Sequence, residues 1–168
     1  MSEPGIGSAY EGWAILNRRL RDVVAGLTTE QLDLRPGPGR WPVWAIVGHA
    51  ACQRVFWLCD FAGEPGAATT RFTDAGFDCP GDDDLENALD AAELVEALDA
   101  TFAIVERCLD RWTPEMLRES ISRPEWGDGW VHSRGWVLAH VFAHDFWHTA
   151  EMNEALAAAG LPVVDPWR

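Results

Sequence analysis

Three of the five histidines stand four residues apart in the stretch 136–152, which reads WVLAHVFAHDFWHTAEM. Four residues turn a helix only about 40° past one full revolution, so a helical stretch places His140, His144 and His148 on one face. Apolar residues fall on or beside the same face, namely Val137, Val141, Met152 and Leu156. The pattern therefore predicts a long helix whose buried side carries imidazole rings.

Buried imidazoles need partners for both ring nitrogens, and two interpretations supply them. A single histidine on an apolar face is more often a core residue with hydrogen-bonded nitrogens. Three on one stripe favour a metal ion, because one ion satisfies several rings at once. Rings one turn apart can share an ion, whereas His140 and His148 are about 12 Å apart along the helix axis. The helix thus offers one pair of ligands, and a further ligand has to come from elsewhere.

A second histidine-bearing helix is predicted from Pro42 to about Phe61, with the proline in its first turn. His49 lies inside the apolar stripe of this helix, near its beginning. Taken alone, His49 fits a core histidine better than a ligand. Taken together with the downstream pair, it is the missing ligand.

Helical periodicity predicts four long helices, at about 8–27, 42–61, 85 or 91 to 112, and 134–160. Short helical turns follow the first and third of them, and residues 63–84 form one long crossover. This order predicts an all-α fold, a single four-helix-bundle domain over residues 1–168. Metal sites in such bundles are commonly built from side chains on facing helices.

Residues typical of helix N-termini mark several of these starts. Thr28 with Gln31 and Asp90 with Glu93 form capping-box pairs. Ser133 is the predicted N-cap of the histidine helix.

Ten tryptophans are too many for chance, and they are predicted to fill a core, line a pocket or cover an interface. Trp126 and Trp130, with His132, lie in a predicted loop at 123–134, just before the histidine helix. These residues either form the wall or lid of a substrate pocket or plug the end of the bundle. The sequence leaves both interpretations open.

The net charge of −14, from 27 acidic and 13 basic residues, limits the partners. Such a field repels phosphate backbones and argues against nucleic-acid binding. No apolar run approaches 18 residues, which excludes a membrane span. The N-terminal segment has neither the basic patch nor the apolar core of a signal peptide, so a cytoplasmic location is expected.

The four cysteines, Cys52, Cys59, Cys79 and Cys108, show no CxxC spacing. In a reducing compartment they are expected to be free thiols. Cys52 lies three residues after His49, which makes it an alternative ligand in place of one histidine.

Two short motifs resemble a known family. A tryptophan precedes a histidine by eight residues, at Trp41 and His49, and an Arg-Gly-Trp sequence at 134–136 starts the histidine helix. In order and spacing, nearly the whole chain resembles the DinB-like superfamily. This superfamily includes bacillithiol- and mycothiol-dependent S-transferases and the metal-binding domain of mycothiol-dependent maleylpyruvate isomerase. The motifs are short and do not select one of these activities.

The resemblance implies a DinB-like bundle with a divalent ion near one end of its core. The ligands would be His49 and the pair His144 and His148, with water completing the coordination. His140 then belongs to the pocket wall or second layer. The isomerase branch has a carboxylate where this chain has His144, which argues against that branch. Glu151, three residues after His148, is expected to orient a ligand.

Such a site has the chemistry of catalytic zinc, with nickel, iron or copper as alternatives. Three neutral imidazoles leave the ion its double charge and open positions, so bound water has its pKa lowered toward about 7 and a bound thiol loses its proton. We expect a metal-dependent S-transferase that joins a low-molecular-weight thiol to a small hydrophobic electrophile, with no catalytic residue beyond the ligands. The alternatives are a metal-dependent hydrolase and a non-catalytic metal- or ligand-binding stress-response protein, which forms a homodimer through its tryptophans.

Overall fold

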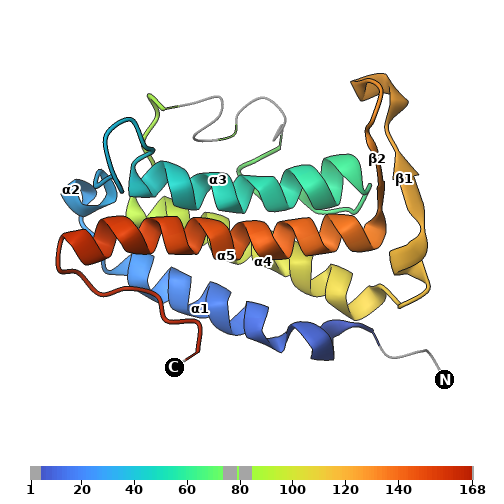
Figure 1. Ribbon diagram of the computed structural model, residues 1–168, viewed down its shortest axis with the longest axis horizontal. Coiled ribbons are helices and arrows are strands. Elements are labelled where there is room, and N and C mark those ends of the chain that lie inside the picture. Colours follow the sequence, from blue (N-terminus) through green and yellow to red (C-terminus); the bar gives the residue numbers. More distant parts are fainter. Residues whose placement is uncertain (1–4, 74–78, 80–84, 168) are drawn as a thin grey trace.

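The computed structural model describes residues 5–73, 79 and 85–167, most of which are helical. The long helices pack side by side (Figure 1), and they are α1 (Glu11–Ala25), α3 (Val43–Val55), α4 (Ala91–Arg111) and α5 (Arg134–Ala158). Shorter helical segments join or extend them: η1 (Gly7–Tyr10), α2 (Thr29–Leu32), η2 (Phe56–Phe61), η3 (Ala67–Thr69), η4 (Met116–Arg118) and η5 (Pro124–Trp126). The predicted helical fold is confirmed. In the predicted crossover, residues 74–78 and 80–84 lie outside the described residues.

The helix starts follow the predicted capping residues. Thr28 and Gln31 bond each other's backbone N–H groups at the start of α2. Asp90 and Glu93 do the same for α4, with both bonds at 2.9 Å. The Ser133 hydroxyl accepts the N–H of the third residue of α5 at 3.0 Å. Each side-chain cap stabilises its helix by about 0.5–2 kcal/mol, which explains why these boundaries were predictable from sequence.

The helix predicted from Pro42 to Phe61 consists of α3 and the π-helix η2, with Pro42 as the N-cap. In η2 the N–H of Ala62 donates to the carbonyl oxygen of Trp57, five residues earlier, at 3.0 Å. The side chains of Trp57 and Phe61 are both buried there. Such widened turns occur frequently at functional sites.

The predicted loop at 123–134 is wrong in part, because it contains one strand of a hairpin. Strands β1 (Ser120–Ser122) and β2 (Val131–Ser133) pair antiparallel, with Ile121 opposite His132. Gly127 and Gly129 have positive φ angles of 119° and 96°, which favour glycine in the turn between the strands. Strands of three residues are too short to show an alternating pattern. The hairpin stands beside the end of η2 and the start of α5 (Figure 1).

The Arg-Gly-Trp sequence at the start of α5 has a structural explanation. Arg134 donates to Glu64 at 3.1 Å and thereby ties the helix start to the segment after η2. A Cβ atom at Gly135 would lie 2.9 Å from the carbonyl oxygen of Leu117. Only glycine permits this close backbone approach without a shift.

A buried ion pair crosses the core, and the sequence reasoning missed it. The guanidinium of Arg54 on α3 donates to Oδ2 of Asp145 on α5 from Nε at 2.9 Å and from Nη2 at 2.8 Å. Trp13 Nε1 on α1 donates to the same oxygen at 2.6 Å. Arg54 also donates to the Leu98 carbonyl and the Thr101 hydroxyl, both at 3.2 Å. Residues of all four long helices are therefore joined through one buried charge pair.

The expectation of four free thiols is wrong, because Cys52 and Cys79 form a disulfide with Cα atoms 5.7 Å apart. The chain path after η3 returns Cys79 to α3, and nothing in a 27-residue separation indicates this. Cys59 and Cys108 are free and buried. Since disulfides are rare in cytosolic proteins, the cysteines no longer support the expected cytoplasmic location.

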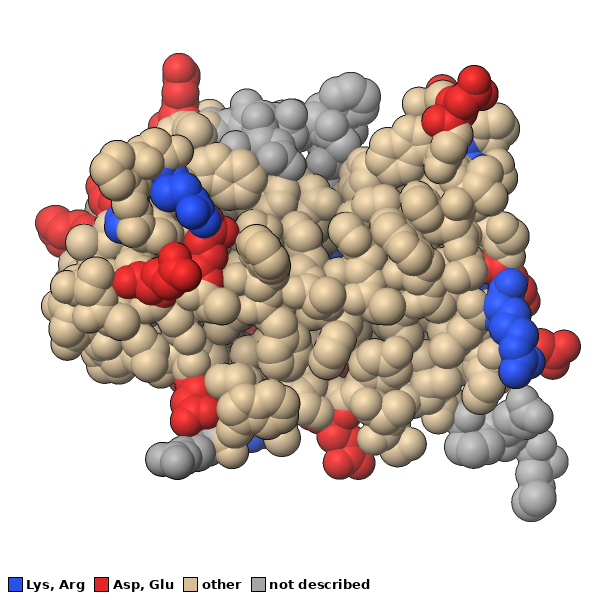
Figure 2. Space-filling model, viewed as in Figure 1, with Lys and Arg blue, Asp and Glu red and all other residues tan. Residues whose placement is uncertain are grey.

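Charged side chains are unevenly distributed on the face shown in Figure 2. They gather near the ends and edges of the molecule, while the middle of this face, over α5, is almost free of them. Among the described residues, no helix has the length and apolar character needed to cross a membrane.

Candidate metal centre

Three imidazole rings meet between α3 and α5. One ring nitrogen from each of His49, His144 and His148 lies within 4.8 Å of the other two. The ring centroids are 5.0 Å apart from His49 to each of the others, and 4.3 Å apart between His144 and His148. The structure thus brings together the residue from the early helix and the pair from the last helix.

The donor geometry fits one divalent ion. Nε2 of His144 and Nε2 of His148 are 3.2 Å apart. Two nitrogens bound at about 2.0–2.1 Å to one tetrahedral ion are separated by roughly 3.3–3.4 Å. The two rings therefore need almost no adjustment to share an ion, and the His49 ring lies within reach of the same point.

Glu151 fixes the tautomer of His148. Nδ1 of His148 is 2.9 Å from Oε2 of Glu151. Because a carboxylate only accepts, Nδ1 carries the hydrogen and Nε2 keeps its lone pair for the cluster. A carboxylate behind a histidine is the usual second-layer arrangement at metal sites. The sequence reasoning assigned this orienting contact to Glu151.

His144 is held in its neutral form. Burial lowers its pKa to about 2, assisted by the positive charge that His148 and His49 would carry when protonated. Its Nδ1 atom is buried, with no hydrogen-bond partner among the described residues. Neutral imidazole is the form that binds metal ions, so the ring is ready for coordination without losing a proton.

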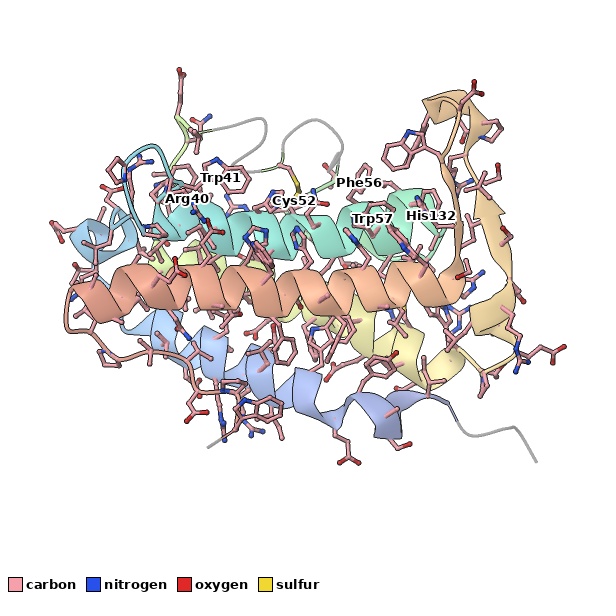
Figure 3. All side chains as sticks on the ribbon, in the orientation of Figure 1. Arg40, Trp41, Cys52, Phe56, Trp57 and His132 are labelled. Atoms are coloured by element: carbon pink, nitrogen blue, oxygen red, sulfur yellow. A yellow bond between two sulfur atoms is a disulfide. The ribbon has the colours of Figure 1, made fainter. Side chains whose placement is uncertain are left out.

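Arg40 and Trp41 enclose the cluster from the loop before α3, beside the first turns of that helix (Figure 3). Arg40 donates to Oε1 of Glu151 from Nη2 at 2.5 Å and from Nε at 3.2 Å. The Trp41 ring lies 5.0 Å from His49 and, nearly parallel at 16°, 6.2 Å from His148. Sequence reasoning noticed Trp41 but missed Arg40, although the two are adjacent.

His140 lies outside the three-histidine cluster. Its ring stacks on Trp136 at 4.8 Å and contacts Trp57 at 4.7 Å, and it is 5.8 Å from His144. Burial, and then His132, lowers the pKa of His140. Together with Trp57 and Trp136, the His140 ring forms an aromatic wall on the hairpin side of the cluster.

Trp126, Trp130 and His132 pack at the hairpin end, and Figure 3 places His132 there, far from Arg40. Trp126 stacks on Phe56 at 5.4 Å, Trp130 lies 5.9 Å from Trp57, and His132 stacks on Trp136 at 3.8 Å. These contacts cover the end of η2. They reach the cluster only through the rings of the aromatic wall.

Cys52 is not available as an alternative ligand, because its sulfur is bonded to Cys79. Asp145, the neighbour of His144, is turned about 100° around α5 and bonds Arg54. The donor set that remains is three imidazoles.

A cavity of about 270 Å³ opens on the other side of the cluster from the hairpin. It is lined by Gly39, Arg40, Trp41, Trp147, His148 and Glu151. His148 is the cluster residue in its lining, so this space borders the three-histidine cluster at His148.

Comparisons with known proteins agree with the fold and the motifs. The sequence profile of the DinB superfamily matches residues 14–152, a range that includes all three clustered histidines. A crystal structure of a DinB-like protein from Bacillus cereus ATCC 10987 has a TM-score of 0.68 and 18% sequence identity, covering 96% of this chain and 97% of that chain. No curated protein matches the chain. Because the family profile spans most of its length, the chain belongs to the DinB superfamily.

Proposed function

We propose that His49, His144 and His148 bind one divalent metal ion, with zinc as the first choice and nickel or iron as alternatives. The observation that carries this proposal is the 3.2 Å separation of two Nε2 atoms beside a third imidazole. The four long helices then serve as a DinB-like four-helix bundle whose facing helices supply the ligands. Imidazole ligands suit zinc, nickel and iron alike, so metal supply decides the occupant.

We further propose that the protein is a thiol-dependent S-transferase. When bound, a divalent ion with open positions deprotonates a coordinated thiol. The thiol sulfur forms a bond to an electrophilic carbon, the leaving group departs with its electron pair, and the thiol proton goes to solvent. The substrates are a low-molecular-weight thiol and a small hydrophobic electrophile.

The side chains around the cluster support this chemistry by orientation and by exclusion of water. Glu151 holds His148 with Nε2 directed at the shared site, and Arg40 holds Glu151. Trp41 and the aromatic wall flank the cluster. Arg40, Trp41 and Glu151 also line the cavity through which a small molecule reaches His148.

Elemental analysis and a conjugation assay test the two parts of this proposal separately. We expect untagged protein to hold one divalent ion per chain and to accelerate the reaction of a cellular thiol with chlorodinitrobenzene. His49→Ala and His148→Ala should lose both properties. His132→Ala, a histidine outside the cluster, is the matched control and should retain both.

Two outcomes would contradict the proposal. If both cluster variants retained the metal, the assignment of His49 and His148 as ligands would be wrong. One ion per chain without acceleration by any cellular thiol would remove the transferase and favour a hydrolase or a metal-binding protein without turnover.

A further inference from the structure

The cavity beside His148 has the dimensions of a small-molecule site. Its volume of about 270 Å³ is just below the range of ligand pockets, which span about 300–1,000 Å³. A molecule with one ring is of this size.

Two tryptophans, Trp41 and Trp147, line this cavity. Trp41 is fixed between His49 and His148 by ring contacts. Trp147 is 71% exposed and makes no ring contact with another described residue. Aromatic faces attract flat rings in offset or edge-on arrangements, with about 0.5–1.5 kcal/mol for each pair beyond burial. A flat ligand would cover the Trp147 surface that the chain itself leaves open.

The charged residues that line the cavity, Arg40 and Glu151, offer hydrogen-bond donors but few unoccupied acceptors. Arg40 uses Nε and Nη2 on Glu151, which is two of its five N–H groups. Its side chain is 51% exposed, so the remaining donors face solvent or the cavity. Both Glu151 oxygens are already occupied, one by Arg40 and one by His148. Charge-assisted bonds to carboxylates are the strongest that a guanidinium makes.

We propose that this cavity binds the electrophilic substrate, and that this substrate is an aromatic carboxylate with a separate electrophilic carbon that bears a leaving group. Its ring packs against Trp41 and Trp147, its carboxylate accepts from Arg40, and its reactive group faces His148. This inference rests on the proposed transferase function and names the class of its electrophile.

A fluorine NMR titration with 4-fluorobenzoate tests the site in metal-free protein, where neither metal nor thiol contributes. We expect saturable binding that weakens about tenfold in Trp147→Ala and in Arg40→Gln, a loss of about 1.4 kcal/mol each. Trp147→Ala leaves the fold intact because the side chain is largely exposed. Two further probes separate the contributions: 4-fluorobenzyl alcohol lacks the carboxylate, and trifluoroacetate lacks the ring. Both should bind at least tenfold more weakly.

Matched control variants lie elsewhere on the surface. Arg111 is 56% exposed and bonds Glu64, which is 8% exposed, much as Arg40 at 51% bonds Glu151 at 10%. Arg111→Gln and Trp167→Ala should therefore bind 4-fluorobenzoate like the unmodified protein. The proposed site would be overturned if binding of 4-fluorobenzoate did not saturate, if the control variants weakened binding as much as Trp147→Ala and Arg40→Gln, or if the alcohol bound as tightly as the carboxylate. The binding of 4-fluorobenzoate is measured without metal or thiol, so its result does not depend on transferase activity. A failure of the transferase proposal can therefore be distinguished from a failure of the proposed binding site.

Discussion

Removal of the Asp145 carboxylate should destabilise the fold more than any change to an exposed ion pair. In Asp145→Ala the guanidinium of Arg54 stays buried and keeps its bonds to Leu98 and Thr101, but it loses its counter-charge. Breaking one side of a buried pair costs about 3–5 kcal/mol. Trp13 Nε1 also loses its acceptor, which adds about 1–3 kcal/mol. We expect a loss of at least about 3 kcal/mol in the free energy of unfolding.

Urea denaturation followed by circular dichroism measures this loss. Asp99→Ala is the control, because Asp99 pairs with Arg21 at a similar 2.8 Å but on the surface, where such pairs contribute about 0.2–1 kcal/mol. Replacing both partners, in Arg54→Met with Asp145→Leu, should recover the part of the loss that comes from the unpaired guanidinium, since apolar residues need no counter-charge, while the Trp13 N–H stays without its acceptor. A loss in Asp145→Ala no larger than in Asp99→Ala would refute the reasoning.

Three further predictions follow from the site and the cysteines. Glu151→Gln removes the charge that orients His148, and metal affinity in a chelator competition titration should fall about 10- to 100-fold; an unchanged affinity would contradict the orienting role. Because the pKa of His144 is lowered to about 2, the unfolded chain binds a proton below about pH 6.5 that the folded chain does not. Metal-free protein should therefore lose stability as the pH falls from about 6.5 toward 2, by up to about 1.4 kcal/mol per pH unit from this group, and His144→Asn should reduce that slope; an equal slope in the variant would contradict the assignment. Burial raises the pKa of Cys59 to about 11 and that of Cys108 to about 12, so iodoacetamide should label no thiol in native protein, two after unfolding, and four after unfolding with reductant; four labels without reductant would contradict the disulfide.

Local chemistry explains the parts of the fold that were predictable from the sequence. The capping side chains of Thr28, Asp90 and Ser133 act within three residues of themselves, so their effect is visible in sequence. The four-residue step of the histidines is likewise a property of one helix. His49 taken alone fits a core histidine better, and only together with the pair on the last helix was it predicted as the missing ligand.

Long-range contacts explain what the sequence did not reveal. Arg54 looks like an ordinary helix cation, and only packing places it beside Asp145, 91 residues away. Arg40 meets Glu151 across 111 residues, and Cys52 meets Cys79 through a crossover with no recognisable signal. The hairpin strands are too short for a pattern. In each case the partner is set by tertiary structure and not by neighbouring residues.

X-ray absorption at the metal K-edge tests the central claim most directly. Protein loaded with one zinc ion should show three imidazole nitrogens at about 2.0–2.1 Å and an additional light-atom ligand from solvent. His49→Ala should not retain zinc through purification, and with excess zinc added it should show only two imidazoles. Sulfur at about 2.3 Å, or an unchanged imidazole count in the variant, would contradict a centre built from His49, His144 and His148.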